Sequence, residues 1–115
     1  MPRYEVVLVP FPFDDLSTTK VRPAISLTDA VGPYRHVILA FITSRVRVED
    51  LEETDVVLEP GQAGFATTGL RAPSTIRLHQ LLTVTETIIL RKLGDLSPEM
   101  QSRVAERLRS LFGLR

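Results

Sequence analysis

Short apolar runs recur along most of the chain, and residues that favour turns separate them. The runs are rich in β-branched residues, which favour strands, while proline, glycine and aspartate between the runs mark turns. This pattern predicts six strands: Tyr4–Val9, Val21–Thr28, His36–Thr43, Asp55–Leu58, Ser74–Val84 and Thr87–Leu90. Short strands with frequent turn signals indicate a mainly β protein, built as a small barrel.

Two of these runs differ in their patterns. The run His36–Thr43 is almost wholly apolar, which predicts a strand buried on both faces. In the fifth run apolar and polar residues alternate in part. Ile76 and Leu78 should therefore lie on one face of the sheet, and Arg77 and His79 on the other.

The end of the chain has the pattern of an amphipathic α-helix. Ser97 can cap its N-terminus, Pro98 fits its first position and Glu99 favours its first turn. Gly113 is a plausible C-terminal stop. Apolar residues recur between them at helical spacing: Met100, Val104, Leu108, Leu111 and Phe112. We expect this helix to pack on the barrel or on a partner.

Length and composition fit a single domain, residues 1–115, of which 43% are apolar. The chain has no cysteine, which excludes disulfides and thiolate chemistry. No apolar stretch is long enough to span a membrane, and residues 1–4 lead into a strand-like run rather than into the apolar core of a signal peptide. These features predict a soluble cytoplasmic protein.

Charge is balanced overall but unevenly distributed. The formal net charge is zero, which provides no general attraction to nucleic acid. Residues 44–60 hold two basic and six acidic side chains, whereas residues 91–115 hold six basic and three acidic ones. A polyanion would therefore have to meet a local basic patch; the alternative for both segments is a solvated face.

Motifs for metal or nucleotide chemistry are missing from the sequence. There is no P-loop, no metal-ligand cluster and no nucleophile elbow, so neither a metal nor another cofactor is expected. What remains is a set of polar residues at the ends and on one face of the predicted strands: Arg22, Thr43, Ser44, Arg77 and His79.

These residue types suit a phosphodiester substrate. A guanidinium binds phosphate oxygens with a forked contact, and hydroxyl groups add hydrogen bonds. If the substrate is RNA, its own 2′-hydroxyl can be the nucleophile. The protein then needs only a base, an acid and stabilisation of the charge on the phosphorane.

Arg22 stands directly before Pro23 at the start of a predicted strand. Proline has no N–H, so it is confined to strand starts, edges and bulges. The simple interpretation of Arg22 is a strand-start arginine that points to water, with its stem packed on the barrel.

Four segments together resemble the MazF/PemK-type toxins of type II toxin–antitoxin systems: "YEVVLVPFPFDDLSTTKVRPAISLT", "ILAFITS", "GLRAPSTIRLHQLLTV" and "LGDLS". The resemblance covers nearly the whole chain, apart from the stretch between Arg45 and Gly61. It implies an SH3-like β-barrel with a C-terminal helix that pairs as a homodimer. The implied activity is metal-independent cleavage of single-stranded RNA, leaving a cyclic phosphate and a 5′-hydroxyl. The implied partner is an antitoxin with an extended acidic tail.

The resemblance also assigns residues. It places Arg22, Thr43, Arg77 and His79 in the catalytic site, with Pro23 fixing the backbone behind Arg22. It implies contacts to the RNA from a second group: Phe11, Phe13, Asp14, Ser17, Lys20 and Ser44. Phe11 or Phe13 could stack on a base, and core packing is the alternative for both.

His79 departs from the family pattern, because relatives often carry an acidic residue there. Histidine can serve in acid–base catalysis, since its ordinary pKa of about 6.5 is close to neutral pH. The alternatives are that His79 contacts the substrate or is structural. His36, at the start of an apolar strand, is interpreted as structural.

Two other functions remain open at this level. CcdB-like toxins share the fold and poison DNA gyrase by binding, through residues of the C-terminal helix. They lack the pairing of Arg22 with Thr43. A catalytically inactive relative that only binds an antitoxin is the other alternative.

Overall fold

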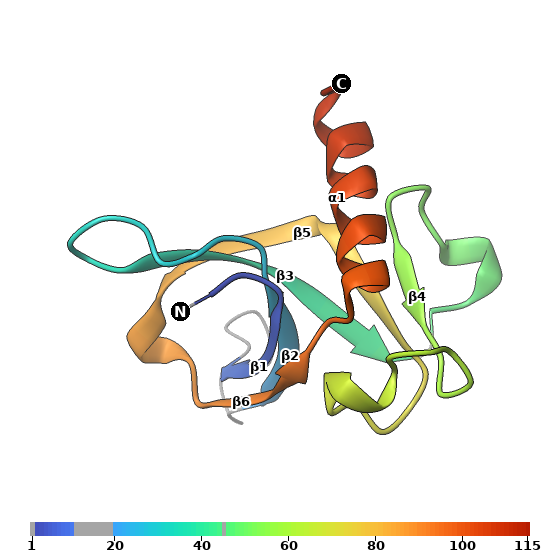
Figure 1. The fold of residues 1–115 in the computed structure, drawn as a ribbon, viewed down its shortest axis with the longest axis horizontal. Helices are drawn as coiled ribbons and strands as arrows, with labels where there is room; N and C mark the ends of the chain where they lie inside the picture. Colours follow the sequence, from blue (N-terminus) through green and yellow to red (C-terminus); the bar gives the residue numbers. More distant parts are fainter. Residues whose placement is uncertain (1, 11–19, 45) are drawn as a thin grey trace.

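The computed structural model describes residues 2–10, 20–44 and 46–115 (Figure 1). Six strands in these ranges form one antiparallel sheet, in the order β4-β5-β3-β2-β1-β6. The strands are β1 (Glu5–Pro10), β2 (Val21–Ser26), β3 (His36–Ser44), β4 (Val56–Leu58), β5 (Ser74–Thr85) and β6 (Arg91–Asp95). Three 3-10 turns and one helix complete the fold: η1 (Val48–Asp50), η2 (Ala66–Thr68), η3 (Glu86–Ile88) and α1 (Pro98–Phe112).

The sheet curls, and a bulge between its two longest strands contributes to the bend. Ala40 of β3 lies opposite Leu81 of β5, but the next residue, Phe41, lies opposite Arg77. Residues 78–80 of β5 therefore have no opposite residue in β3. Such bulges bend a strand and increase its twist. Figure 1 shows the sheet wrapping around itself as a half-barrel with α1 standing across it. The expected mainly β, barrel-like fold with a C-terminal helix is confirmed.

Each face of the curled sheet has its own apolar core. The face that carries α1 contains a large cluster to which Met100 and Val104 of the helix belong, 2% and 0% exposed. The opposite face contains a smaller cluster: Val7, Val9, Ala24, Val37, Leu39 and Phe41. Neighbouring residues on a strand point to opposite faces, so Val6 joins the first cluster and Val7 the second.

The ends of helix α1 agree with the prediction. The hydroxyl oxygen of Ser97 accepts a hydrogen bond from the backbone N–H of Met100 at 3.2 Å, and Gly113 adopts a left-handed conformation with φ 67°. Leu108 and Leu111 pack against the larger core. Phe112, which is expected on the same apolar face, is instead 57% exposed, so the core contacts of the helix end at Leu111.

The last strand was predicted in the wrong place. Residues 86–88 form the turn η3, and the strand follows at Arg91–Asp95, pairing with β1. The strand β6 lacks the apolar pattern used to predict strands, because it carries several charged residues. An edge strand tolerates such charges, whereas a central strand does not. Two carboxylates compensate the charge of Lys92, whose Nζ lies 2.9 Å from Glu5 Oε2 and 3.1 Å from Asp95 Oδ1.

Two glycines let β6 and the turn η2 approach closely. A Cβ atom on Gly94 would lie 2.2 Å from the carbonyl oxygen of Thr67, and one on Gly69 would lie 2.2 Å from that of Leu93. Both contacts are to backbone atoms that have little room to move. The two segments therefore fit together only while both positions lack a side chain.

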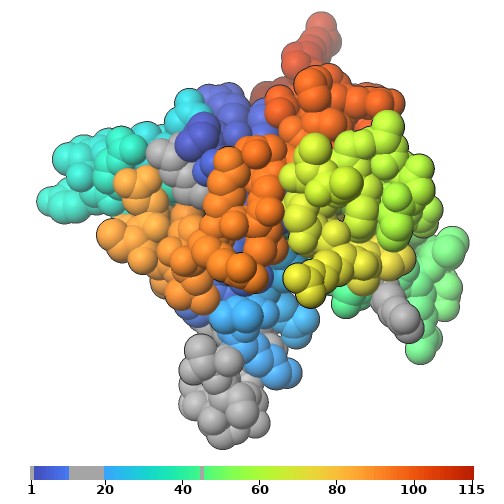
Figure 2. All heavy atoms as spheres, turned by 60° about the horizontal axis from the view of Figure 1, so that its bottom comes forward, coloured from blue at the N-terminus to red at the C-terminus, as the bar shows by residue number. Residues whose placement is uncertain are grey.

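Strand β3 is buried on both faces only over part of its length. Leu39 to Ile42 are buried, as predicted, but Ile38 is 37% exposed. The exposed part belongs to the projecting β2–β3 hairpin, coloured cyan in Figures 1 and 2. None of the helices in the described ranges has the length and apolar composition needed to cross a membrane.

Candidate active site

Strand pairing brings the predicted site residues of β2 and β3 to one place. Ala24 of β2 lies opposite Phe41 of β3 in an antiparallel pair. Continuing this register by two residues puts Arg22 opposite Thr43. Both side chains then lie on the face opposite to helix α1, because Ala24 and Phe41 belong to the apolar cluster of that face.

Strand β5 continues the same row of side chains. Thr75 lies opposite Thr43, and Arg77 lies opposite Phe41. On the far side of β5, Val57 of β4 pairs with Thr75, and the residue two positions earlier, Asp55, reaches Arg77. Arg77 and Asp55 belong to the next row on the same face, the row of Ala24 and Phe41. We call five residues of these two adjacent rows the polar strip: Arg22, Thr43, Asp55, Thr75 and Arg77.

Asp55 is the residue of the strip that sequence reasoning did not assign. Its side chain is only 1% exposed, and its Oδ1 lies 3.1 Å from Nε of Arg77 and 3.8 Å from Nδ1 of His79. Its other oxygen accepts a hydrogen bond from the backbone N–H of Glu52 at 2.9 Å. We call Asp55, Arg77 and His79 the Asp55 cluster. The sequence signal was weak, because Asp55 simply opens a predicted strand.

The alternation predicted for β5 is confirmed. Ile76 and Leu78 are fully buried in the core under the helix, while Arg77 and His79 both meet Asp55 on the other face. The exposed fractions of the two side chains are 15% for Arg77 and 34% for His79. His79 lies in the bulged residues of β5, at the edge of the polar strip.

Three buried polar atoms of the strip make no well-aligned hydrogen bond to the described residues: Thr43 Oγ1, Asp55 Oδ1 and Arg77 Nε. Asp55 Oδ1 and Arg77 Nε lie 3.1 Å apart, but the N–H does not point at the oxygen. Their contact is therefore an ion pair without a well-aligned hydrogen bond. For Thr43, the lack of a hydrogen bond means that no other residue in the described part of the chain uses the donor and acceptor capacity of the hydroxyl. Such groups are costly to bury, and their presence in a native fold requires an explanation.

The other predicted residues have varied positions. Arg22 is half-buried, Ser44 is exposed opposite Ser74 at the end of β3, and Lys20 is exposed directly before β2. His36 is exposed at the other end of β3, with its ring centroid 6.2 Å from that of Tyr34. Four predicted contact residues lie outside the described ranges: Phe11, Phe13, Asp14 and Ser17.

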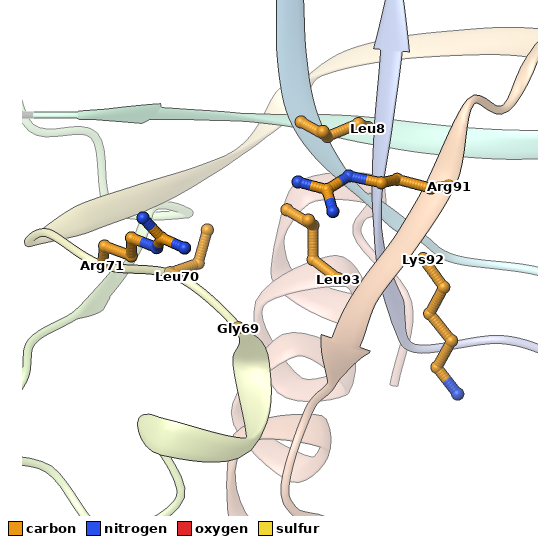
Figure 3. Close-up of a pocket in the computed structure, with 7 residues that line it drawn as sticks. All are labelled: Leu8, Gly69, Leu70, Arg71, Arg91, Lys92 and Leu93. Atoms are coloured by element: carbon orange, nitrogen blue, oxygen red, sulfur yellow. The ribbon is translucent and has the colours of Figure 1, made fainter.

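A pocket of about 470 Å³ lies outside the strip, between β6 and the loop before β5. Arg71 and Arg91 point toward each other across it, whereas Lys92 points away (Figure 3). Leu8 lines this pocket and alternates with Val7 and Val9, so the pocket and the polar strip belong to opposite faces of the sheet. Over the described ranges no three His, Asp or Glu side chains gather in a way that could hold a metal ion.

The fold and the strip define a small half-barrel protein with two arginines and a buried threonine hydroxyl on one sheet face. A sequence model of one family, described as "PemK-like, MazF-like toxin of type II toxin-antitoxin system", matches residues 2–112. Because the match spans nearly the whole chain, the protein belongs to this toxin family, as the sequence resemblance predicted. Comparison with curated protein sequences gives no match.

Solved structures share the fold at low sequence identity. The "Mycobacterium tuberculosis toxin MazF-mt6" is 24% identical, with a TM-score of 0.73 over 96% of this chain and 98% of that one. An endoribonuclease from Mycobacterial species, solved with its cognate antitoxin, is 15% identical, with a TM-score of 0.72 over 100% and 97% of the two chains. A MazE–MazF complex from Deinococcus radiodurans is 15% identical, with a TM-score of 0.70 over 100% and 98%.

Proposed function

We propose that this toxin is a metal-independent endoribonuclease that recognises short sequences in single-stranded RNA and cleaves the RNA there. The observation that carries the proposal is the polar strip, in which strand register brings arginine and threonine side chains from β2, β3 and β5 together. Family membership supports it, as do the structural relatives that are named endoribonucleases.

The proposed reaction uses the 2′-hydroxyl of the RNA as the nucleophile. A base removes its proton, the oxygen attacks the adjacent phosphorus, and the bond to the 5′-oxygen of the next nucleotide breaks. An acid returns a proton to that oxygen, so the products are a 2′,3′-cyclic phosphate and a 5′-hydroxyl. The chemistry needs neither an oxidant nor a second substrate.

Each catalytic residue has a proposed task. Arg22 and Arg77 bind the scissile phosphate and stabilise the charge that develops on it, a role for which the guanidinium fork is suited. The unused hydroxyl of Thr43 donates to a phosphate oxygen. His79 takes the proton of the 2′-hydroxyl; its side chain is 34% exposed, so a bound RNA could reach it.

The remaining predicted residues would bind the rest of the RNA. We propose that they contact bases and flanking phosphates on both sides of the cleaved bond: Phe11, Phe13, Asp14, Ser17, Lys20 and Ser44. Lys20 and Ser44 border the strip at the start of β2 and the end of β3. Lys20 and Ser44 would therefore contact the RNA at the margin of the strip.

Two protein partners complete the proposal. A cognate antitoxin would lay an acidic segment across the strip, near Arg22 and Arg77. A second copy of this chain would cover exposed apolar side chains, of which Ile38 and Leu81 on the paired strands β3 and β5 are 37% and 38% exposed. The RNA groove would then be shared between two copies.

The test is cleavage of a long RNA by the purified protein in EDTA, followed by mapping of the cut ends. Arg22→Ala should lower the rate by about 10²–10³-fold, as does the loss of one donor to a developing oxyanion. Arg71→Ala, which removes an arginine from the opposite face, should cleave normally. A folded wild-type protein that leaves the RNA intact in EDTA would contradict the proposal and favour binding to gyrase or to the antitoxin alone.

A further inference from the structure

We propose that Asp55 is a positioning residue that acts through both other members of the Asp55 cluster. Its Oδ1 faces the proton-bearing Nδ1 of neutral His79 at 3.8 Å, ready to accept a hydrogen bond from it, and holds Nε of Arg77 at 3.1 Å. These contacts leave Nε2 of His79 and the two terminal nitrogens of Arg77 for the RNA. The role in cleavage rests on the proposed function, but the arrangement of the side chains can be tested without it.

The burial of Asp55 is the first reason. A carboxylate with 1% of its side chain exposed is costly unless charged or hydrogen-bonding groups compensate it. Arg77, at 3.1 Å and 15% exposed, supplies the opposite charge. An ion pair that served only stability could be exchanged for apolar side chains at little cost, so its place between two site residues points to a second role.

The anchoring of the carboxylate is the second reason. The backbone N–H of Asp55 donates to the carbonyl oxygen of Glu52 at 3.0 Å, and the backbone N–H of Glu52 donates back to Oδ2 of Asp55 at 2.9 Å. This reciprocal pair locks the turn before β4 and holds one carboxylate oxygen in place. Oδ1 is thereby fixed in position, and both Arg77 and His79 approach that same oxygen.

The position of His79 is the third reason. It lies in the bulge of β5, where residues 78–80 have no opposite residue in β3, so its ring is oriented by its neighbours rather than by sheet pairing. Its Nδ1 lies 3.8 Å from Asp55 Oδ1. This is an electrostatic contact, which tightens to a hydrogen bond with a small shift of the ring, as contacts of catalytic groups often do when substrate binds.

The tautomer of the ring follows from this contact. The nitrogen of a neutral imidazole that carries the proton is set by the acceptor beside it. With a fixed carboxylate at Nδ1, the proton belongs on Nδ1 and the lone pair on Nε2. A general base needs this lone pair directed away from Asp55, toward the 2′-hydroxyl. After proton transfer, the carboxylate faces an imidazolium and stabilises it.

The first experiment reads the tautomer in the wild-type protein without RNA. Nitrogen-15 NMR of the neutral imidazoles is simple here, because the chain has two histidines. His79 should carry its proton on Nδ1, and Asp55→Asn should abolish this preference. His36, whose ring contacts Tyr34 rather than a carboxylate, is the internal control and should be the same in both proteins. A neutral His79 with its proton on Nε2 in the wild type would overturn the proposal.

The second experiment separates positioning from RNA binding. Asp55→Asn keeps the size of the side chain and should lower kcat by about tenfold or more, since a positioned general base contributes roughly 10²–10⁴-fold. Its affinity for an RNA with a 2′-deoxy nucleotide at the cleavage site should stay close to that of the wild type. Asp50→Asn makes the same charge change on an exposed residue of η1 and should leave both constants unaltered.

The outcomes distinguish the two proposals. Wild-type kcat in a folded Asp55→Asn protein would overturn the role of Asp55 while leaving the ribonuclease assignment intact. A wild-type protein that cleaves no RNA would overturn the ribonuclease assignment, and the NMR experiment would still decide the arrangement of Asp55 and His79. If Asp55→Asn does not fold, the tautomer of wild-type His79 decides alone.

Discussion

At the scale of single residues, the polar strip holds buried polar groups whose hydrogen-bonding capacity the described residues do not use. Thr43 buries a hydroxyl that has no hydrogen-bond partner within the described ranges. Apolar neighbours such as Phe41 and Ile42 precede it on the same strand, so an apolar side chain would suit the position equally well. This agrees with the proposal that the hydroxyl donates a hydrogen bond to a phosphate oxygen of the RNA.

Thr43→Val tests this explanation, because it replaces a hydroxyl by a methyl group of similar size. The melting temperature should be unchanged or higher, since the buried polar atom is removed. Cleavage should fall by about tenfold or more if the hydroxyl stabilises the transition state. Thr83→Val, at an exposed position of β5, should leave the cleavage rate unaltered. Full activity in a folded Thr43→Val protein would remove Thr43 from the mechanism.

The sequence allowed part of this site to be predicted. The alternation in β5 correctly separated Arg77 from Ile76, because the period of a strand is local information. The grouping of Arg22 with Thr43 came from the family resemblance, and the register agrees with it. Asp55 could not be found in this way. Its meeting with Arg77 depends on how β4 pairs with a strand that begins some twenty residues later, and no local pattern specifies that pairing.

At the scale of elements, the contrast between α1 and β6 shows what local chemistry can determine. The bounds of the helix were predicted accurately, because its capping residues and its apolar spacing all lie within one continuous segment of the sequence. Strand β6 was missed because the residues that stabilise it are distant: β1 supplies its pairing and Glu5 its counter-charge. The apolar run Thr87–Leu90, which was predicted as the strand, instead begins inside the 3-10 turn η3 (Glu86–Ile88) and leads the chain to the edge of the sheet.

Lys92 provides a test of how β6 is held. Hydrogen bonds to Glu5, and then to Asp95, raise the pKa of Lys92 above its ordinary value. A raised pKa means that the folded protein binds the proton more tightly than the unfolded chain does. The stabilisation is therefore fully present below the ordinary lysine pKa of about 10.4, and it is lost as the pH rises through the higher pKa of the folded state.

Lys92→Gln should accordingly lower the melting temperature at neutral pH, because it leaves the Glu5 carboxylate, which is only 11% exposed, without its counter-charge. The difference between variant and wild type should shrink at strongly alkaline pH. Thermal unfolding followed by circular dichroism at several pH values measures both effects, with Arg115→Gln at the exposed C-terminus as a charge-matched control. A difference that stays constant across alkaline pH would mean that Lys92 acts through packing of its alkyl chain.

At the scale of the whole molecule, the protein presents apolar surface that one copy does not cover. The exposed side chains Ile38 and Leu81 lie on adjacent strands. We therefore expect a homodimer, which light scattering at tens of micromolar should detect. The paired variant Ile38→Lys and Leu81→Lys should dissociate it while each chain remains folded, because both positions face solvent in one copy. A monomeric wild-type protein would contradict the shared groove.

Binding of the antitoxin should be governed by the strip on the other face. If an acidic segment meets Arg22 and Arg77, its affinity should fall as salt is raised, since exposed charges are screened over about 10 Å at 0.1 M. Titration calorimetry at several salt concentrations measures this slope. Arg22→Ala should make the slope shallower, whereas Arg71→Ala should not. An affinity that does not depend on salt would indicate an apolar contact, for which the exposed end of α1 is available.

The close packing at Gly69 and Gly94 has a consequence for the mutations that inactivate the toxin. Every substitution of a glycine by another amino acid introduces a side chain, and at positions 69 and 94 its Cβ atom would lie 2.2 Å from a backbone oxygen. When survival of toxin expression comes from a mutation in the toxin's coding sequence, that mutation must disable the toxin. Survivors should therefore carry changes at Gly69 and Gly94 as well as at the polar strip, although neither glycine belongs to the strip. A genetic selection would therefore identify the contact between η2 and β6 as essential for toxicity.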